Sequence, residues 1–457
     1  MLGKTKKIHF VGIGGIGMSG IAELLINQGF EVSGSDLNST PITKHLKQKG
    51  AQIAKGHDPN LIVNADVVVK SSAVKDDNPE IAAALAQKIP VIRRAEMLSE
   101  IMRMSYGIGL AGTHGKTSTT SMVGSVLSAA ALDPTVIVGG IVKNYGSNNL
   151  LGSGKYIVVE ADEFDRSFLT LSPIIAGITN IEADHLDCYK DLEAVKSAFI
   201  EYANKVPFFG RVIACLDDHG VQSIIPEIKK NIVTYGLSKQ ANIQARNIEM
   251  KNFKATYTAY SDGKKLGNIE LNVMGNHNIL NSLLAVGIGL ELEIPFAAIQ
   301  KGLADYNGVF RRFEYKGMKD DVLVYDDYAH HPTEIEATLK GVRDSVENRI
   351  VTVFQPHLFS RTRDFYQEFG RSFFQSDVLV ITPIYPAREN PIPGITGKMI
   401  AKAAIQSGHK NVIYIDKNED IIPQMENLAQ PKDIFITMGA GNIYKYGESF
   451  LKGLKDI

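Results

Sequence analysis

The stretch Gly112-Thr113-His114-Gly115-Lys116-Thr117 constrains the fold of this chain more than any other. It follows a short apolar run, Tyr106 to Ala111, and precedes a segment rich in small and apolar residues with helical spacing, 118–131. A strand, a glycine turn and a helix in this order are typical of a phosphate-binding loop, because the turn amides and the helix N-terminus attract an anion. We therefore predict an α/β domain that holds a nucleotide phosphate at this turn.

The residues of this loop have distinct predicted roles. Lys116 is expected to reach the β- and γ-phosphates, and the Thr117 hydroxyl is expected to lie on Mg²⁺. The rest of the predicted ATP-binding loop comprises Gly112, Thr113, His114, Gly115 and Ser118. Only two residues separate the first glycine from the Gly-Lys pair, whereas the usual loop has four. A tight strand-to-helix turn with a solvated lysine is the alternative interpretation.

The bulk composition limits the classes of protein that remain. A chain of 457 residues is too long for one compact core and predicts about three domains. A formal net charge of −1 gives no reason to expect nucleic acid or an anionic membrane as a partner. Two cysteines form no disulfide framework, and no apolar run approaches the ~20 residues of a membrane span. We expect a cytoplasmic protein.

The N-terminal segment carries a second glycine-rich turn. A short apolar strand, Ile8 to Val11, leads into Gly12, Gly14 and Gly17, which fit the pattern G-x-G-x-x-G. A helix is expected at 19–28 and a second strand from Glu31, which ends at Asp36. This resembles a dinucleotide-binding fingerprint, in which the carboxylate accepts a hydrogen bond from a ribose or a base. NAD, FAD, a UDP-sugar or no ligand at all remain open.

The alternation of strands and helices continues through the first hundred residues. Strands are predicted at 65–70 and 90–92, with a helix at 78–87 between them. Polar side chains follow these strands, where an open parallel sheet binds its ligands; they are Ser71, Ser72, Arg93 and Arg94. Alternatively, the two arginines are the solvated start of a helix.

Acidic residues follow two strands downstream of the phosphate loop. The strand from Tyr156 runs into Glu160, Asp162, Glu163 and Asp165, and the strand at 174–180 runs into 182–187, which includes His185. Buried carboxylates are unfavourable unless cations are near, so a Mg²⁺ site is indicated. Helix capping by the later aspartates is the alternative. Further on, the amides of Asn278 and Asn281 could cap a helix or contact a purine edge.

A third domain is predicted from about Phe310. Arg311 and Arg312 precede a strand that ends in 326–332, Asp-Asp-Tyr-Ala-His-His-Pro, and another strand at 350–354 ends in Gln-Pro-His. Because parallel strands end at one edge of a sheet, we expect their polar side chains to cluster; they are Tyr328, His330, His357 and Arg361. Alternatively, these four residues are ordinary polar residues of the protein surface.

Taken together, these motifs resemble those of the Mur ligase family, the ATP-dependent amide-forming enzymes of peptidoglycan synthesis. They occur in the expected order over essentially the whole chain, and the short phosphate loop is the family's own form. The motifs that carry the resemblance are Gly12 to Met18, Gly112 to Thr117, Glu160 to Glu163, Asn180 to His185, Arg311 to Glu314, Asp326 to Pro332 and Phe354 to His357.

The resemblance implies a three-domain α/β fold and a reaction. The domains would be a Rossmann-like UDP-sugar-binding domain at 1–104, a central P-loop ATPase domain at 105–308 and a C-terminal Rossmann-like amino-acid-binding domain at 309–457. The reaction would be ATP-dependent ligation of L-alanine to UDP-N-acetylmuramate through an acyl phosphate, with ATP and Mg²⁺ required. A monomer or a homodimer would fit equally well.

The resemblance also implies roles for individual residues. The metal would be held by Thr117, Glu160 and His185. ATP would further contact Asn278, Asn281, Arg312 and Asp327. Alanine would meet Tyr328, His330, His357 and Arg361. The UDP-sugar would meet Gly14, Gly15, Ile16, Gly17, Asp36, Ser71, Ser72 and Arg93. The catalytic set would comprise Lys116, His185, His330 and Arg361.

One feature departs from several sibling ligases, which carry a carbamylated lysine about 15 residues after the metal histidine. Here the region reads Ala198-Phe199-Ile200, so no carbamate is assigned. Three other functions stay open. They are a ligase of the same family that attaches a tripeptide, an NAD-dependent oxidoreductase that uses the first domain, and a nucleotide-gated binding protein without ligase chemistry.

Overall fold

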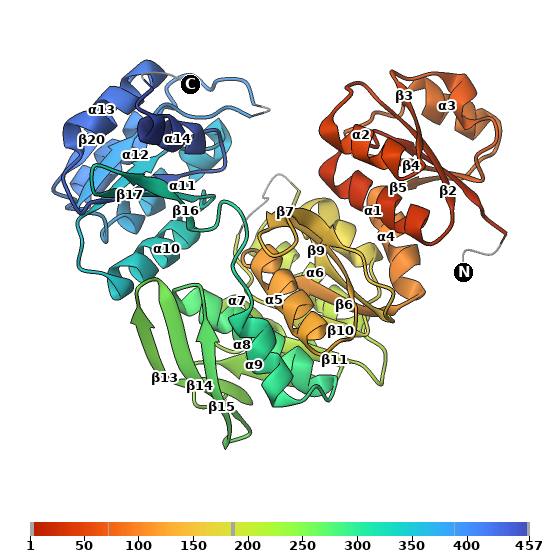
Figure 1. Ribbon diagram of the computed structural model, residues 1–457, viewed down its shortest axis with the longest axis horizontal. Coiled ribbons are helices and arrows are strands. Elements are labelled where there is room, and N and C mark those ends of the chain that lie inside the picture. Colours follow the sequence, from red (N-terminus) through yellow and green to blue (C-terminus); the bar gives the residue numbers. More distant parts are fainter. Residues whose placement is uncertain (1–3, 72, 184–187, 388, 455–457) are drawn as a thin grey trace. The chain divides into compact units, whose positions relative to one another are not determined.

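The computed structural model describes residues 4–71, 73–183, 188–387 and 389–454 (Figure 1). The chain divides into two compact units, and each is described by itself. One unit comprises Met1–Arg246, Thr258–Ile269 and Leu280–Tyr306, and the other comprises Asn247–Tyr257, Glu270–Ile279 and Asn307–Ile457. The described residues form three sheets of five, ten and six strands.

The first sheet is parallel throughout, with the order β3-β2-β1-β4-β5. Its strands are β1 (Lys7–Val11), β2 (Glu31–Asp36), β3 (Gln52–Lys55), β4 (Val67–Lys70) and β5 (Val91–Arg93). From β1 the chain adds β2 and β3 on one side and then crosses to β4 and β5 on the other side of β1, so the strand order reverses at β1. In open α/β sheets this reversal is where a ligand binds, beyond the carboxyl ends of the strands.

Helices cover both faces of the first sheet. Apolar residues of α1 (Ile16–Asn27), α2 (Pro41–Gln48) and α4 (Arg94–Arg103) share one core cluster with Ile8 and Phe10 of β1. Ile81 and Ala84 of α3 (Pro79–Ala86) pack with Val11 and Val68 on the other face. Strand residues alternate between the faces, which places successive side chains of β1 in different cores.

The second sheet has the order β15-β14-β13-β12-β11-β10-β6-β9-β7-β8. The neighbours from β7 to β13 pair in parallel, and β8 is antiparallel to β7. The strands are β6 (Tyr106–Ala111), β7 (Thr135–Val142), β8 (Ser147–Leu150), β9 (Tyr156–Ala161), β10 (Ile175–Ile178), β11 (Arg211–Cys215), β12 (Ile232–Gly236), β13 (Ile243–Lys251), β14 (Lys254–Ser261) and β15 (Lys264–Leu271). The associated helices are α5 (Lys116–Ala129), α6 (Leu192–Asn204), α7 (His219–Ile224), α8 (Asn276–Glu291) and α9 (Phe296–Ala304).

The third sheet has the order β16-β17-β21-β18-β19-β20, and only its edge strand β16 pairs antiparallel. The strands are β16 (Glu314–Lys319), β17 (Val322–Asp327), β18 (Ile350–Phe354), β19 (Val378–Ile381), β20 (Val412–Tyr414) and β21 (Ile434–Met438). Helices α10 (Pro332–Ser345), α11 (Phe359–Ser372) and α12 (Lys398–Gln406) supply one core, and α13 (Ile421–Leu428) and α14 (Tyr444–Lys452) supply the other. The sheet is therefore covered on both faces, as parallel sheets require.

The predicted α/β fold with three sheet-bearing parts is confirmed. The predicted boundary at 104/105 falls between β5 of the first sheet and β6 of the second, and the one at 308/309 falls just before β16. These exact limits stay a prediction, because the two compact units divide the chain differently. Among the residues that the structure describes, no helix is both long and apolar enough to cross a membrane.

Candidate active site

The phosphate-binding loop joins the carboxyl end of β6 to α5. Gly112 and Gly115 have φ angles of +148° and +82°, values that side chains other than glycine rarely adopt. A Cβ at Gly115 would also lie 2.7 Å from Oδ1 of Asn281. The backbone therefore turns sharply and stays bare, as close approach of a phosphate requires. Thr117 and the buried Ser118 lie in the first turn of α5.

The segment after β10 supports this loop through hydrogen bonds. The Asn180 side chain accepts from the His114 amide at 2.7 Å and donates to the His114 carbonyl at 3.1 Å. Its own carbonyl accepts from the Thr113 amide at 3.0 Å. The Thr113 hydroxyl in turn accepts from the Glu182 amide at 2.9 Å. Two neighbouring strand ends thus fix the shape of the loop.

The Lys116 ammonium lies among oxygen atoms. Its Nζ donates to Oε2 of Glu163 and to the carbonyl of Gly112, both at 2.6 Å, and Asp162 lies 3.9 Å away. Burial opposes the charge, but the attraction of Glu163 and Asp162 outweighs it and raises the pKa of Lys116. Lys116 is therefore a fixed cation at the loop.

Glu160 at the end of β9 lies beside Thr117. Burial raises the pKa of Glu160, against hydrogen bonds from the Gly139 amide and the Thr117 hydroxyl. Its Oε1 is buried and has no hydrogen-bond partner within the described part of the chain. A buried, unsatisfied carboxylate oxygen next to a hydroxyl is a donor set that suits a hard cation such as Mg²⁺. His185, the third predicted metal ligand, lies outside the described residues.

The first glycine turn is held by the end of β2. The amides of Gly12 and Ile13 donate to the Ser35 carbonyl at 2.9 and 3.1 Å, and the Gly14 amide donates to Oδ2 of Asp36 at 2.9 Å. A Cβ at Gly14 would lie 2.8 Å from that oxygen, so this position has room only for glycine. Asp36 thus braces the turn, a role that its predicted contact with the nucleotide did not include.

The other predicted UDP-sugar residues lie close to the same turn. Gly15 is the N-cap of α1, and Ser71 approaches Gly12, where a Cβ would be 3.2 Å from the Ser71 Cβ. Ser72 lies outside the described residues, and the side chain of Ile16 is likewise not described. Arg93 is exposed at the N-cap of α4, whereas the Arg94 side chain reaches Gly17, within 3.2 Å of a Cβ there.

A buried polar network lies behind the first turn. The Glu80 carboxylate has no solvent exposure and accepts from Nε2 of His9 at 2.7 Å, the Ser35 hydroxyl at 2.9 Å and Nδ1 of His57 at 2.9 Å. Burial works against its charge, but these bonds win and lower the pKa of Glu80. The Ser35 carbonyl also accepts hydrogen bonds from the Gly12 and Ile13 amides of the turn. The network therefore fixes the position of the turn.

In the second unit, Asp327 at the end of β17 connects two backbone segments. Its carboxylate accepts from the Phe313 and Ala329 amides, both at 2.7 Å. Burial raises the pKa of Asp327 to about 6, although the Arg312 charge and both amides oppose the shift. Asp327 therefore sets the shape of the two segments that carry Arg312 and Tyr328.

Arg312 is held by a residue that the sequence analysis did not assign. Its Nη1 donates to Oε1 of Glu334, in the first turn of α10, at 3.2 Å, and its guanidinium lies 5.5 Å from the Tyr328 ring centroid. The neighbouring Arg311 has a structural role instead, since it bonds to Asp326 and to the Gly439 carbonyl.

The structure brings the predicted amino-acid-binding residues together. The Tyr328 and His330 ring centroids are 5.2 Å apart, and those of His330 and His357 are 5.9 Å apart. Burial lowers the pKa of His330 to about 3, with Glu334 opposing the shift and Arg361 adding to it. The Arg361 charge is thus close enough to act on His330. His357 stacks on Tyr385 with centroids 5.9 Å apart.

The two predicted adenine contacts lie on α8. The Asn278 amide donates to the Met274 carbonyl at 2.7 Å and lies 3.1 Å from Nε2 of His277. Burial, with the Arg312 charge second, lowers the pKa of His277 to about 4. Asn281 is buried against Gly115 of the phosphate loop.

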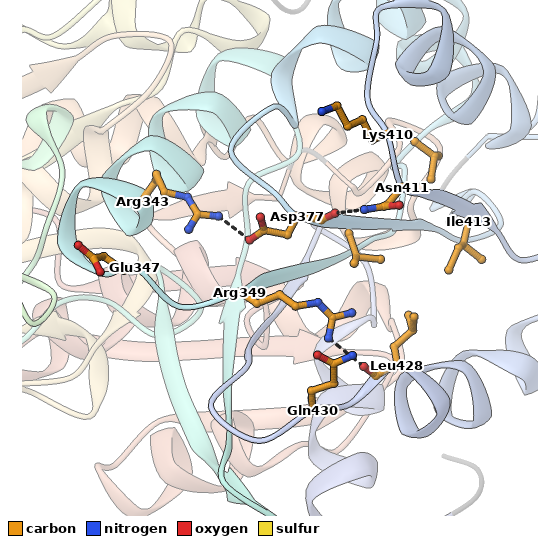
Figure 2. A pocket seen from close by; sticks show the side chains of 11 residues that line it. Arg343, Glu347, Arg349, Asp377, Lys410, Asn411, Ile413, Leu428 and Gln430 are labelled. Atoms are coloured by element: carbon orange, nitrogen blue, oxygen red, sulfur yellow. Dashed lines mark hydrogen bonds and ion pairs between the residues drawn. The ribbon is translucent and has the colours of Figure 1, made fainter.

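A cavity of about 720 Å³ lies at the amino edge of the third sheet, where β18, β19 and β20 begin (Figure 2). Arg343 donates to Asp377 at 2.6 Å, and Asn411 donates to the Asp377 carbonyl at 3.0 Å. Arg349 donates to the Leu428 carbonyl at 3.2 Å and to Asp433 at 3.0 Å. None of the predicted site residues lines this cavity.

Three contributors therefore escaped the sequence analysis as individual residues. Asn180 stood only inside a quoted motif, Glu163 was named among the acidic residues after a strand but not as the partner of Lys116, and Glu334 was not singled out. The signal for Glu334 was its place three residues after His331, since an acid in the first turn of a helix faces the segment before it. Arg94, rather than Arg93, contacts the glycine turn. The sequence could not show which of these two adjacent arginines makes the contact.

Comparison with known families gives three consecutive matches. The model of the Mur ligase family, catalytic domain, matches residues 7–106. The model of the Mur ligase middle domain matches residues 110–289. The model of the Mur ligase, glutamate ligase domain, matches residues 311–441.

Individual relatives are similar in sequence to this chain over nearly their whole length. The UDP-N-acetylmuramate–L-alanine ligase of Geotalea uraniireducens is 50% identical over 455 residues, covering 100% of this chain and 99% of the relative. The ligase of the same name from Salinibacter ruber is 49% identical and covers 100% and 96%. The crystal structure of the UDP-N-acetylmuramate-alanine ligase of Thermotoga maritima superimposes with a TM-score of 0.78 at 30% identity, covering 98% of both chains. A murein peptide ligase from Psychrobacter arcticus shares the fold, with a TM-score of 0.67 at 24% identity and 99% coverage of both chains.

Proposed function

This chain belongs to the Mur ligase family, and on that premise we propose that it joins L-alanine to UDP-N-acetylmuramate in the synthesis of peptidoglycan precursors, at the expense of ATP. The full-length similarity to relatives that bear the name of this reaction carries the proposal. The local geometry supports it, because a glycine-rich loop with a buried lysine, a second glycine turn and a cluster of polar rings follow the carboxyl ends of strands.

ATP and Mg²⁺ are assigned to the loop after β6. Lys116 would neutralise charge on the transferred phosphate, and the loop amides and α5 would hold the remaining oxygens. Thr117 and Glu160 would hold the Mg²⁺, which when bound would spread the negative charge of the triphosphate. Arg312, Asp327, Asn278 and Asn281 would complete the nucleotide contacts.

The first glycine turn is assigned to the UDP moiety. The amide-rich segment from Gly14 to Gly17 suits a pyrophosphate at the N-terminus of α1, and Arg94 adds a positive charge beside Gly17. Asp36 and Ser71 border the same turn. These contacts would place the UDP-sugar, so that its lactyl carboxylate receives the phosphate.

The polar ring cluster in the third sheet is assigned to alanine. Arg361 would pair with the α-carboxylate, and Tyr328, His330 and His357 would surround the amino group. The carboxylate of the UDP-sugar would take the γ-phosphoryl group of ATP to form an acyl phosphate and ADP. The alanine amine would then attack the acyl carbon, and phosphate would leave as the amide forms. Exclusion of water by these residues would protect the acyl phosphate from hydrolysis.

Phosphate release is the measurement that tests the proposal. We expect release that requires ATP, Mg²⁺, UDP-N-acetylmuramate and L-alanine together. Release that depends on the tripeptide L-alanyl-γ-D-glutamyl-meso-diaminopimelate instead of alanine would favour the muropeptide ligase. Oxidation of NADH on addition of substrates, with no phosphate release, would favour the oxidoreductase. We further assign the protein to the cytoplasm as a monomer or homodimer, which size-exclusion chromatography with light scattering would resolve.

A further inference from the structure

Glu334 connects two residues that have different assignments. One carboxylate oxygen accepts from Nη1 of Arg312 at 3.2 Å. The other accepts from the His330 backbone amide at 3.1 Å and lies 3.3 Å from Nδ1 of the His330 ring. The Glu334 side chain is 8% exposed, so water competes little for either oxygen. Arg312 is assigned to ATP and His330 to alanine.

The atoms around Nδ1 of His330 determine which ring nitrogen carries the proton. Nδ1 lies 3.0 Å from the Tyr328 carbonyl oxygen and 3.3 Å from the Glu334 carboxylate. A carbonyl oxygen and an ionised carboxylate accept hydrogen bonds but donate none. Nδ1 must therefore be the N–H nitrogen. In a neutral imidazole, this leaves the lone pair on Nε2.

Burial is the main reason that the His330 ring stays neutral, and the Arg361 and Arg312 charges add to its effect on the pKa. The Glu334 charge and the hydrogen bond to the Tyr328 carbonyl oppose this lowering of the pKa without outweighing it. A neutral ring with a fixed tautomer is an acceptor at Nε2, and an acceptor is what an amino group needs as a partner.

We infer that Glu334 is a positioning residue, which holds the His330 imidazole in the Nδ1–H tautomer so that Nε2 accepts a hydrogen bond from the amino group of the incoming amino acid. The assignment of the amino acid to this cluster rests on the proposed function. The same carboxylate fixes Arg312, so one side chain orients groups directed at both small substrates.

The alternative is a purely structural role, since Glu334 also accepts from a backbone amide next to the helix start. Glu334→Gln separates the two roles. The amide oxygen of glutamine can face only one side, and the charged Arg312 is the stronger donor. The amide NH₂ then faces Nδ1 and favours a lone pair there, whereas the Tyr328 carbonyl, 3.0 Å from Nδ1, still favours the Nδ1–H form, so the population of the Nε2–H tautomer rises. Helix α10 keeps its proline at the first position and its length.

Nitrogen-15 NMR of histidine side chains reports the tautomer directly and requires no activity. The chain has 11 histidines, and the His330 signals are those that vanish in His330→Gln. We expect the Nδ1–H tautomer in the native protein and a shift toward Nε2–H in Glu334→Gln. Glu336→Gln, the same change at an exposed site on the same helix, should leave the His330 signals unaltered.

Steady-state kinetics give the second readout. Loss of one hydrogen bond to the amino group should raise the KM for alanine about ten-fold, with the KM for UDP-N-acetylmuramate unchanged. A native protein with His330 in the Nε2–H form would overturn the inference, as would a Glu334→Gln variant that keeps both tautomer and alanine KM. Absence of alanine-dependent phosphate release in the native protein would overturn the proposed function instead, and leaves the tautomer measurement valid.

Discussion

Charged side chains lie at both ends of the strands of the third sheet, at the amino ends (the amino edge) and at the carboxyl ends (the carboxyl edge). Their contacts differ between the two. At the amino edge, Arg343 bonds directly to Asp377 (Figure 2), and Arg349 bonds directly to Asp433. At the carboxyl edge, the Asp327 carboxylate accepts from two backbone amides, and the Glu334 carboxylate that accepts from Arg312 also accepts from the His330 amide.

The difference shows how a parallel sheet separates folding from ligand binding. The charges of each amino-edge pair neutralise each other; the Arg349–Asp433 pair joins the starts of β18 and β21, and the Arg343–Asp377 pair joins the end of α10 to the start of β19. At the carboxyl edge the Arg311–Asp326 pair has the same structural role, but Asp327, Arg312 and His330 are fixed by backbone amides or by the Glu334 carboxylate, which would leave the Arg312 charge and the His330 lone pair for a ligand. This agrees with the general rule that open α/β sheets bind ligands beyond the carboxyl ends of their strands.

The largest expected effect is at the carboxyl edge of the second sheet. Lys116→Ala removes the cation that we propose faces the transferred phosphate, and kcat/KM for alanine ligation should fall about 10³-fold. Binding of UDP-N-acetylmuramate, measured by calorimetry, should persist within about two-fold, because the first glycine turn is unchanged. Lys410→Ala, the same substitution beside the amino-edge cavity, should leave the rate unaltered. Joint loss of ligation and UDP-sugar binding would contradict the assignment of separate subsites.

A smaller effect is expected from Asp327, through its pKa of about 6. A carboxyl group whose folded pKa lies above its unfolded value of 3.8 favours the folded state below pH 3.8, and this contribution is lost as the pH rises to about 6. The loss amounts to about 3 kcal/mol. Asp327→Asn should remove this slope from the free energy of unfolding, measured by urea denaturation between pH 4 and 7. If the free energy of unfolding changes with pH in the same way for the native protein and the variant, Asp327 does not titrate in this range.

The smallest effect tests the amino edge. Arg349→Met leaves Asp433, which is 2% exposed, without its cation, and the free energy of unfolding should fall by about 1–2 kcal/mol, since Arg349 is itself 27% exposed. The kinetic constants should stay within about two-fold of native values. Urea denaturation and steady-state assays on the same sample separate these outcomes. A large rise in KM for any substrate would contradict the proposal that the amino edge serves stability and the carboxyl edge serves ligand binding.

The sequence predicted the strands that lie inside the sheets well. Strands at 106–111 and 350–354 have the predicted limits, because buried parallel strands read as short continuous apolar runs. The three strands β13 to β15 were not predicted, although Asp262-Gly263 between β14 and β15, with φ of +46° and +77°, is a strong hairpin signal.

The site was less predictable, for physical reasons. Gly112 and Gly115 carry a local signature because their positive φ angles favour glycine, and Lys116 is recognised by its place directly after them. Glu334 carries none, because its importance comes from the spatial meeting of Arg312 with His330, which lie 22 and 4 residues away. Similarly, Asp36 was expected to contact a nucleotide, and only the coordinates reveal that it also accepts from the Gly14 amide.

The contact between Lys116 and Glu163 gives nucleotide binding the character of an exchange. The lysine already has a carboxylate partner at 2.6 Å, so a phosphate must displace one anion to gain the cation. Measured ATP affinity then reflects the difference between two ion pairs rather than the strength of one. If ATP binds at this loop as proposed, the return of Glu163 to Lys116 would favour release of the diphosphate product.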